Sequence, residues 1–188
     1  DYFTVCDPDH PYEPCLLRRH QDSMDELSVI IPVYNEDHNL LDPLVKELKS
    51  LGIEVIVVDD GSQNPYPKSI KHGVNFGYGG ALLTGIKNAT QEVILIQDAD
   101  LEYDPEEYKK LIAPIENGQA DVVYGSRFVG SSPHRVMLFW HFTGNRFLTL
   151  LCNIAANLNL TDMETGFKAF RKKALDSITL EETDFGFE

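Results

Sequence analysis

The chain has 188 residues, of which 16 are basic and 30 acidic, and its formal net charge is −14. This length predicts about one domain with a substantial hydrophobic core. A chain this acidic is not expected to bind the backbone of a nucleic acid over a broad face. No apolar run approaches the roughly 20 residues that span a bilayer. The three cysteines form no C-x-x-C pair, which argues against zinc and favours free thiols in a reducing compartment.

The first 27 residues differ from the rest of the chain in composition. They contain Pro8, Pro11 and Pro14 and many charged side chains, and they show no apolar period. We therefore expect residues 1–27 to form an extended N-terminal arm or linker, and residues 28–188 to form the folded domain.

From residue 28 onward, short apolar runs alternate with segments of helical period. Leu41, Leu44 and Leu48 recur on one face of an expected helix, which Gly52 ends. The apolar runs are rich in valine and isoleucine, as buried strands are. In chain order we expect strands at 28–33, 54–58, 70–72, 93–96 and 122–124, with helices at 37–51 and 79–89 and another opened by Asp104-Pro105-Glu106.

This alternation is typical of parallel β-α-β units. The expected fold class is α/β, with a mostly parallel sheet flanked by helices. In such folds, ligands bind beyond the carboxyl ends of the strands. Four carboxylates follow strand ends and are therefore expected at one edge of the sheet, namely Asp59, Asp60, Asp98 and Asp100.

The sequence Asp98-Ala99-Asp100 directly follows an expected strand. Two carboxylates at positions i and i+2 can reach one hard cation, although a single pair of this kind is also common in turns and helix caps. A second acidic strand end, Asp59-Asp60, concentrates negative charge at the same edge. A divalent cation shared with a diphosphate ligand would neutralise that charge, so we expect both at this edge.

Other motifs for phosphate binding and catalysis are missing from the sequence. It has no G-x-x-x-x-G-K-[ST] loop and no G-x-S-x-G elbow. Gly77-Tyr78-Gly79-Gly80 begins like a dinucleotide fingerprint, but Leu82 stands at the place of the third small residue. These observations disfavour kinase, dehydrogenase and serine hydrolase activities.

Several short motifs follow one another along the chain: 28–36 (SVIIPVYNE), 57–62 (VVDDGS), 75–79 (NFGYG) and 98–100 (DAD). Together they resemble family 2 glycosyltransferases of the A-type fold, which implies that the sheet is Rossmann-like and nucleotide-binding. The segments 125–128 (GSRF) and 161–168 (TDMETGFK) are similar to the branch that contains dolichol-phosphate mannose synthase and bacterial polyprenyl-phosphate glycosyltransferases. The resemblance covers residues 28–188 and implies a catalytic domain that is truncated at its C-terminus.

The resemblance implies a nucleotide-sugar donor such as a UDP- or GDP-sugar, an inverting transfer, and Mg²⁺ or Mn²⁺ as cofactor. It also implies roles for individual residues, carried over by motif. These are Pro32, Tyr34, Glu36, Asp59 and Asp60 for the nucleoside pocket, Asp98 and the catalytic Asp100 for the diphosphate and the metal, Glu102 as a further metal ligand, and Arg127 for the acceptor phosphate.

The stretch 122–161 contains no Asp or Glu, where the composition of the whole chain would give about six. It carries Arg127, Arg135 and Arg146. Guanidinium groups grip phosphate oxygens well, so this acid-free stretch suits a phosphate acceptor.

An aromatic run at 136–142 and an apolar run at 147–151 lie in the same stretch. They predict a helix that is buried against the core or turned with its aromatic side toward a membrane surface, and both can hold along one helix. Asn145, Arg146 and Asn153 argue against a membrane span.

The expected function is transfer of a sugar to a polyprenyl phosphate, by an enzyme of the cytoplasm or of the cytoplasmic face of the membrane. An ionised phosphate needs positioning by arginine more than deprotonation. A hydroxyl acceptor would need a general base, for which Asp162 and Glu164 are the candidates. Both carboxylates equally suit a structural role, in which they anchor the turn at Thr165-Gly166.

Three alternatives remain open. The first is a glycosyltransferase of the same fold that acts on a sugar or protein hydroxyl in glycan synthesis. The second is a nucleotidyltransferase, which is disfavoured because Tyr34-Asn35-Glu36 stands where such enzymes usually have a glycine-rich basic loop. The third is a non-catalytic module that binds nucleotide sugars.

Overall fold

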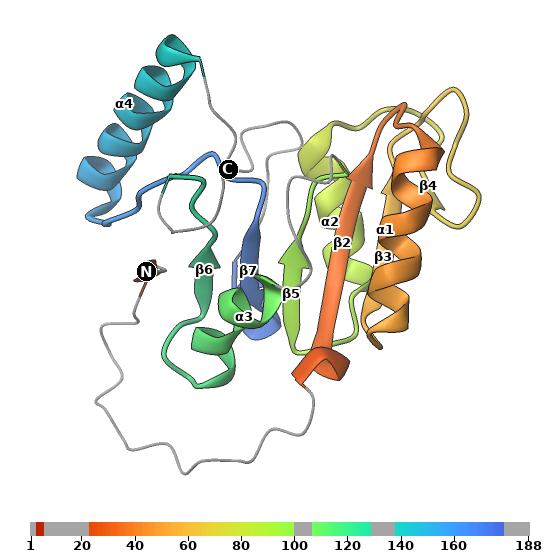
Figure 1. Cartoon of the computed structure of the whole chain (residues 1–188), viewed down its shortest axis with the longest axis horizontal. Helices are drawn as coiled ribbons and strands as arrows, with labels where there is room; N and C mark the ends of the chain where they lie inside the picture. The colour runs from red at the N-terminus through yellow and green to blue at the C-terminus, as the bar shows by residue number, and fades with distance from the viewer. Residues whose placement is uncertain (1–2, 6–22, 100–106, 129–137, 179–188) are drawn as a thin grey trace.

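The computed structural model describes residues 3–5, 23–99, 107–128 and 138–178 (Figure 1). Within these residues, seven strands form one sheet in the order β1-β6-β7-β5-β2-β3-β4. The strands are β1 Phe3–Val5, β2 Leu27–Val33, β3 Glu54–Asp59, β4 Ile70–Lys71, β5 Val93–Ile96, β6 Val122–Tyr124 and β7 Lys168–Arg171. The helices are η1 Ser23–Glu26, α1 His38–Ser50, α2 Tyr78–Asn88, α3 Tyr108–Glu116, α4 Phe139–Ala156 and α5 Lys172–Asp176.

Five of the seven described strands run in one direction. β2 pairs in parallel with β3 and β5, and β3 pairs in parallel with β4. β7 lies between β5 and β6 and is antiparallel to both, so β6 points the same way as β5. β1 pairs antiparallel with β6. The predicted α/β class with a mostly parallel sheet is therefore confirmed.

Helices cover both faces of the sheet, which explains why the strands show no polar alternation. In β2, Val29, Ile31 and Val33 pack in the layer that contains α1 and α3, whereas Ile30 packs in the layer that contains α2 and α5. Figure 1 shows α1 and α3 in front of the sheet and α2 behind it. Because successive side chains enter opposite layers, both sets must be apolar.

The expected elements occur near their expected bounds. α1 begins after Asp37, whose Oδ1 accepts a hydrogen bond of 2.9 Å from the backbone N of Asn39, and it ends just before Gly52, which has a φ of 82°. The expected cap at 104–106 lies outside the described residues. β7 was not expected, and within the expected N-terminal arm the structure has β1 and η1. The division of the chain at residue 27 stays a prediction.

One carboxylate ties together three segments at the edge where β2 and β3 begin. Glu54 accepts hydrogen bonds from the Ser28 hydroxyl and from Thr90, through its backbone N at 2.9 Å and its Oγ1 at 2.8 Å. Burial raises the pKa of Glu54, but these hydrogen bonds outweigh it and hold the pKa below its ordinary value. The contacts fix both strands to the loop that follows α2.

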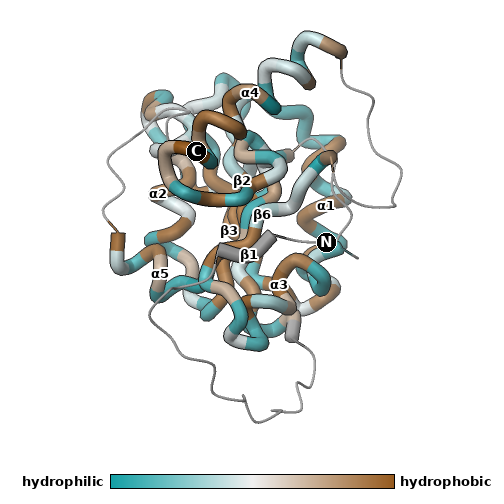
Figure 2. The backbone as a smooth tube through the Cα atoms, turned by 90° about the vertical axis from the view of Figure 1, so that its left-hand side faces the viewer, coloured by the Kyte–Doolittle hydropathy of each residue, from teal (hydrophilic) through white to brown (hydrophobic). Residues whose placement is uncertain are grey.

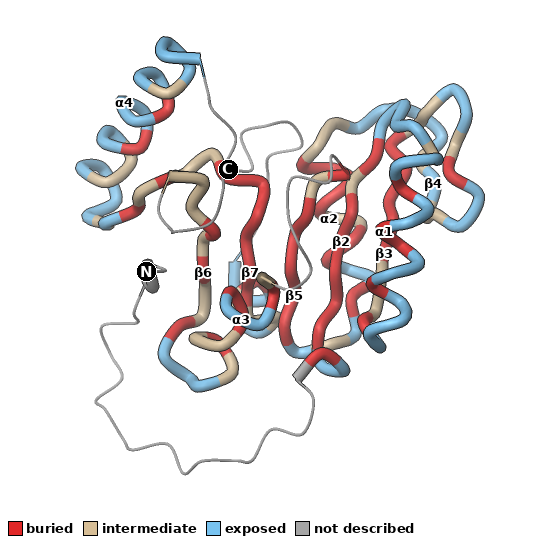
Figure 3. The backbone as a smooth tube through the Cα atoms, in the orientation of Figure 1, coloured by how far each residue is buried: buried red, intermediate tan, exposed pale blue. Residues whose placement is uncertain are grey.

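α4 stands apart from the layered sheet, as Figures 1 and 3 show. Of its 18 residues, only Asn145 and Thr149 are buried. The expectation that this helix is buried against the core is therefore wrong, because its apolar side faces outward. Figure 2 shows hydrophobic segments along the helix. The exposed large apolar side chains are Phe139, Trp140, Phe147, Leu148, Leu150, Leu151 and Ile154.

No helix in the described part of the chain is both long enough and apolar enough to cross a membrane.

Candidate functional site

The carboxyl ends of the parallel strands meet at one edge of the sheet. β2 ends at Val33, β3 at Asp59, β5 at Ile96 and β6 at Tyr124. The antiparallel strand β7 begins at Lys168, whose register partners are Ile96 and Tyr124. The loop before β7 therefore arrives at the same edge as the four strand ends, and the expected site residues that the structure describes all lie there.

Asp59 organises the loop that follows β3. Its side chain is buried, and its Oδ1 and Oδ2 accept hydrogen bonds from the backbone N of Ser62 at 2.9 Å and of Tyr66 at 2.8 Å. Tyr66 is itself buried and donates its hydroxyl to Asp42 at 2.7 Å. Burial, together with the hydrogen bond to Asp42 and its negative charge, raises the pKa of Tyr66 to about 12. The tyrosine thus stays a neutral donor that locks the loop.

Asp60 holds the next part of the same loop. Its Oδ1 and Oδ2 accept hydrogen bonds from the backbone N of Phe76 at 2.9 Å and of Gly77 at 2.8 Å. His72 Nδ1 lies 2.6 Å from Asp60 Oδ1, and His72 Nε2 lies 2.9 Å from Thr84 Oγ1. Asp60 is buried, so its carboxylate joins the loop before α2 to the end of β3. Sequence reasoning did not identify His72 as part of this cluster.

The segment after β2 presents its side chains to solvent from a fixed turn. Asn35 has a φ of 57°, its backbone N donates to Ser62 Oγ at 2.8 Å, and its Oδ1 accepts from the backbone N of Gln63 at 2.9 Å. Tyr34 is 52% exposed, and Glu36 is exposed. Pro32, also expected in the nucleoside pocket, is half-buried within β2. These residues adjoin the loop that Asp59 and Asp60 hold.

Asp98 lies two residues past the end of β5 and is half-buried. Its Oδ1 accepts a hydrogen bond of 3.1 Å from the Tyr78 hydroxyl at the start of α2. Asp100 and Glu102, the other expected metal ligands, lie outside the described residues. Among the residues that are described, no three His, Cys, Asp or Glu side chains cluster as a metal site.

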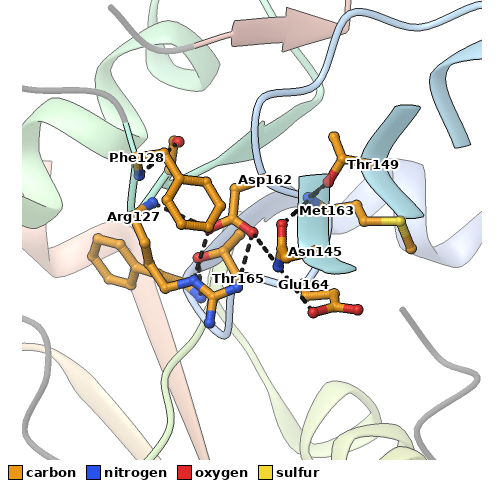
Figure 4. A network of polar contacts seen from close by, with 10 residues as sticks. Arg127, Phe128, Asn145, Thr149, Asp162, Met163, Glu164 and Thr165 are labelled. Carbon is orange, nitrogen blue, oxygen red and sulfur yellow. Dashed lines mark hydrogen bonds and ion pairs between the residues drawn. The ribbon is translucent and has the colours of Figure 1, made fainter. Parts of the chain in front are cut away.

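Arg127 follows β6 and is paired with Asp162 (Figure 4). Its Nε donates to Asp162 Oδ2 at 2.7 Å, and its Nη2 donates to Asp162 Oδ1 at 2.9 Å. The side chain of Arg127 is 24% exposed, whereas that of Asp162 is 0% exposed. The buried carboxylate therefore orients a guanidinium that still reaches the surface. Arg135, the second arginine expected here, lies outside the described residues.

Asn145 of α4 joins the same network. Its Nδ2 donates to Asp162 Oδ1 at 3.2 Å and to Glu164 Oε2 at 2.9 Å. The backbone N of Arg127 also donates to Asp162 Oδ2 at 3.2 Å. Asp162 thus accepts four hydrogen bonds, which favours an anchoring role over that of a general base, because a base needs a lone pair directed at the acceptor. Asp162 anchors Arg127 in this way, and the suggested anchoring of the turn at Thr165-Gly166 stays a prediction.

The loop that carries Asp162 also touches Asp98. A Cβ added at Gly166 would lie 1.9 Å from Asp98 Oδ2, so the backbone of Gly166 passes against this carboxylate. Only glycine leaves room for that approach. One short loop therefore contacts the carboxylate after β5 at one end and the arginine after β6 at the other.

An arginine that a buried carboxylate orients, at the carboxyl edge of an α/β sheet, is suited to an anionic ligand. Residues 28–179 match the family model described as glycosyl transferase family 2. The chain belongs to this family, and the expected enzyme class is thereby confirmed.

Two curated relatives agree with the branch that the motifs indicated. The chain is 32% identical over 177 residues to dolichol-phosphate mannosyltransferase of Pyrococcus furiosus, covering 85% of this chain and 50% of that protein. It is 30% identical over 176 residues to UDP-N-acetylglucosamine–dolichyl-phosphate N-acetylglucosaminyltransferase of Methanococcus voltae, covering 78% of this chain and 70% of that protein. The chain thus spans half the length of the first relative. The predicted resemblance to the polyprenyl-phosphate branch is confirmed.

The fold also resembles a solved structure of glucosyl-3-phosphoglycerate synthase from Mycobacterium tuberculosis in complex with Mn²⁺, UDP-glucose and phosphoglyceric acid. The TM-score is 0.62 at 17% identity, and the match covers 87% of this chain and 65% of that chain. This likeness concerns the fold alone.

The contact between Gly166 and Asp98 generates a testable prediction. Gly166→Ala should lower the free energy of unfolding by about 1–3 kcal/mol, because the added methyl group must displace the carboxylate or the loop. Gly144→Ala is the matched control, since a Cβ there meets nothing within 4 Å. Within α4 that change should be neutral or stabilising by about 0.5–1 kcal/mol. Urea unfolding measures both variants, and equal stabilities would contradict the close approach.

Proposed function

We propose that this domain transfers a sugar from a nucleotide-sugar donor to the phosphate of a polyprenyl phosphate, with inversion at the anomeric carbon. One observation carries the proposal: the loop 162–166 contacts Asp98 through Gly166 and Arg127 through Asp162. The carboxylate of Asp98 suits a cation, and the guanidinium of Arg127 suits a phosphate. The same short loop contacts both groups. The names of both curated relatives contain dolichol phosphate, which supports the acceptor class.

On the donor side, the nucleoside is proposed to bind at the edge formed by β2 and β3. The exposed side chains Tyr34 and Glu36 follow β2, and Pro32 precedes them. Asp59 and Asp60 accept hydrogen bonds from the backbone of the loop that follows β3. Their proposed role therefore includes holding this loop beside the bound nucleoside.

The proposed cofactor is Mg²⁺ or Mn²⁺, held by Asp98 together with Asp100 and Glu102. Asp98 fits this role because carboxylate oxygens are the ligands that hard cations prefer, and it stands half-buried just past a strand end. The structural neighbour in complex with Mn²⁺ and UDP-glucose supports a divalent metal. When bound, such a cation neutralises charge on the departing diphosphate as a Lewis acid.

On the acceptor side, Arg127 is proposed to hold the phosphate. An ionised phosphate oxygen attacks the anomeric carbon, and the bond from that carbon to the nucleoside diphosphate breaks with its electron pair. The second pKa of a phosphate monoester is about 6, so at neutral pH the acceptor needs positioning and no general base. Asp162 engages Nε and Nη2 of Arg127, which aims the guanidinium while leaving 24% of the side chain exposed.

A hydroxyl acceptor is less well supported by the geometry. It would need a base, and the four hydrogen bonds that Asp162 accepts leave this carboxylate poorly suited to the task. Glu164 accepts one hydrogen bond from Asn145 and remains the better candidate for a base in that case.

We further propose that α4 contacts a membrane and so brings the domain to its lipid acceptor. A helix normally buries its apolar side, whereas α4 buries Asn145 and Thr149 and exposes Trp140 to 78% and Ile154 to 71%. An outward apolar side suits the headgroup region of a bilayer. We propose on this basis that the domain works at a membrane surface, and the cytoplasmic face is the side that the sequence analysis expects.

The metal proposal predicts that Asp98→Asn removes the stabilisation that Mn²⁺ and a nucleotide sugar together confer on the domain. An amide retains the shape of the side chain and loses the charge that a hard cation requires. Thermal unfolding should show an increase in Tm for the wild type with UDP- or GDP-sugars and Mn²⁺, and none for the variant. Asp176→Asn, an exposed carboxylate in α5, is the control. An undiminished shift in Asp98→Asn would contradict the assignment.

The acceptor proposal predicts that Arg127→Lys lowers kcat/KM for a short-chain polyprenyl phosphate by roughly 10- to 100-fold, because an ammonium cannot reproduce the planar fork. Donor affinity should change less than about twofold. Arg171→Lys is the matched control, since Arg171 is also held by a carboxylate, Asp121, but lies at the end of β7 away from the site.

Transfer to both acceptor classes is measured with the wild type and these two variants. Efficient transfer to a sugar hydroxyl, with none to the lipid phosphate, would overturn the proposed function. Binding of the donor without any turnover would instead indicate a non-catalytic module.

The membrane proposal predicts that the double variant Trp140→Ser, Ile154→Ser binds lipid vesicles at least about tenfold more weakly, because both exposed side chains would enter the bilayer. Leu40→Ser, which changes an exposed leucine of α1 that is 47% accessible, is the control. Flotation with vesicles of phosphatidylethanolamine and phosphatidylglycerol measures the bound fraction. Equal binding of the double variant and the control would contradict the role of α4.

A further inference from the structure

The contacts of α4 with the rest of the domain form a polar seam. Asn145, Thr149 and Asn153 are spaced four residues apart and therefore lie on one side of the helix. Asn153 exchanges two hydrogen bonds of 2.8 Å with the backbone of Leu160. Thr149 Oγ1 accepts a hydrogen bond of 3.3 Å from the backbone N of Met163. The seam thus follows the loop that leads to the candidate site.

Within the described part of the chain, Asn145 is the member of this seam that contacts charged groups of the site. Its carboxamide nitrogen donates to both Asp162 and Glu164, while its Oδ1 accepts a hydrogen bond of 3.3 Å from Thr149 Oγ1 (Figure 4). A primary amide has two N–H groups, one for each carboxylate, and it is neutral. It therefore donates to two negative side chains without adding charge, whereas leucine has no donor and aspartate would add a negative charge.

Asp162 lies between Asn145 and Arg127. Its Oδ1 accepts from Asn145 and also from Nη2 of Arg127, so both donors share one oxygen atom. The carboxylate that holds the guanidinium of Arg127 is thus held in turn by a residue of α4.

We infer that Asn145 is a positioning residue that couples the placement of α4 to the orientation of Arg127. Hydrogen bonds are directional, so a small rotation or shift of α4 changes the Asn145–Asp162 contact before it changes apolar packing. Binding of the apolar side of α4 to a membrane would in this way change the orientation of Arg127. This inference rests on the proposed function for its role in catalysis, but the coupling itself concerns only the described residues.

The test compares Asn145→Leu with Asn153→Leu. Both variants remove an asparagine from the seam, but only the first removes a contact with Asp162. The apolar contact of Phe142 with Phe128, at 5.2 Å between ring centroids, is retained in both and keeps the helix near the domain. Asn145→Gln, which retains both N–H donors, is the conservative variant.

Enzyme kinetics provide the first measurement. Asn145→Leu should raise KM for the polyprenyl phosphate by roughly tenfold, with donor affinity unchanged, because a misdirected guanidinium weakens acceptor binding first. Asn153→Leu should stay within about twofold of wild type, and Asn145→Gln should recover most of the loss. Equal effects of the two leucine variants would mean that general docking of α4 matters and would overturn the inference.

Arginine-detected NMR provides a measurement that needs no activity. The Nε–H of Arg127, assigned through Arg127→Lys, should exchange slowly with water in the wild type because it donates to a buried carboxylate. Exchange should be at least about tenfold faster in Asn145→Leu and nearly unchanged in Asn153→Leu. Adding vesicles should shift this signal in the wild type and leave it unshifted in Asn145→Leu.

The two measurements separate the possible failures. If the wild type transfers no sugar to a lipid phosphate, the proposed function fails, and the NMR comparison alone decides the coupling. Unchanged Nε–H exchange in Asn145→Leu would overturn the inference whatever the acceptor is.

Discussion

The proposed acceptor side of this domain depends on one buried carboxylate, Asp162. A carboxylate removed from water must be surrounded by donors, since an unpaired buried charge is strongly destabilising. Here the donors come from Arg127 at the end of β6 and from Asn145 in α4. The need to satisfy this group therefore fixes the relative positions of the end of β6, α4 and the loop before β7. The hydrogen bonds that stabilise buried Asp162 thus also position Arg127 as a candidate phosphate-binding group.

The proposed donor side also depends on buried carboxylates that are surrounded by hydrogen-bond donors. Asp59 and Asp60 are buried at the end of β3, and backbone N–H groups of the following loop supply most of their hydrogen bonds. Charge-assisted hydrogen bonds of this kind are stronger than neutral ones and can hold an irregular loop without regular secondary structure. Asp59, Asp60 and Asp162, which the sequence analysis assigned to binding or catalysis, thus also hold the neighbouring loops and Arg127 in position.

α4 reverses the usual relation between amphipathicity and burial. Its polar seam contacts the domain, and its apolar side is exposed. Polar contacts are directional and weak individually, so they define a position without the large stabilisation that an apolar interface would provide. Such a helix can respond to an apolar surface on its other side while remaining tied to the site through Asn145.

The sequence alone determined the α/β class, the chain positions of most strands and helices, and the edge at which Asp59, Asp60, Asp98 and Arg127 gather. Those features follow from local periodicity and from the rule that the carboxyl ends of parallel strands share one edge of the sheet. Tertiary structure decided the rest. β7 has only four residues and gains its strand conformation from pairing with β5 and β6. The pairing of Asp162 with Arg127 joins residues 35 positions apart, and the outward side of α4 depends on which of its faces finds partners in the domain. Neither could be read from composition or spacing, because each is set by contacts between segments that meet only in the folded chain.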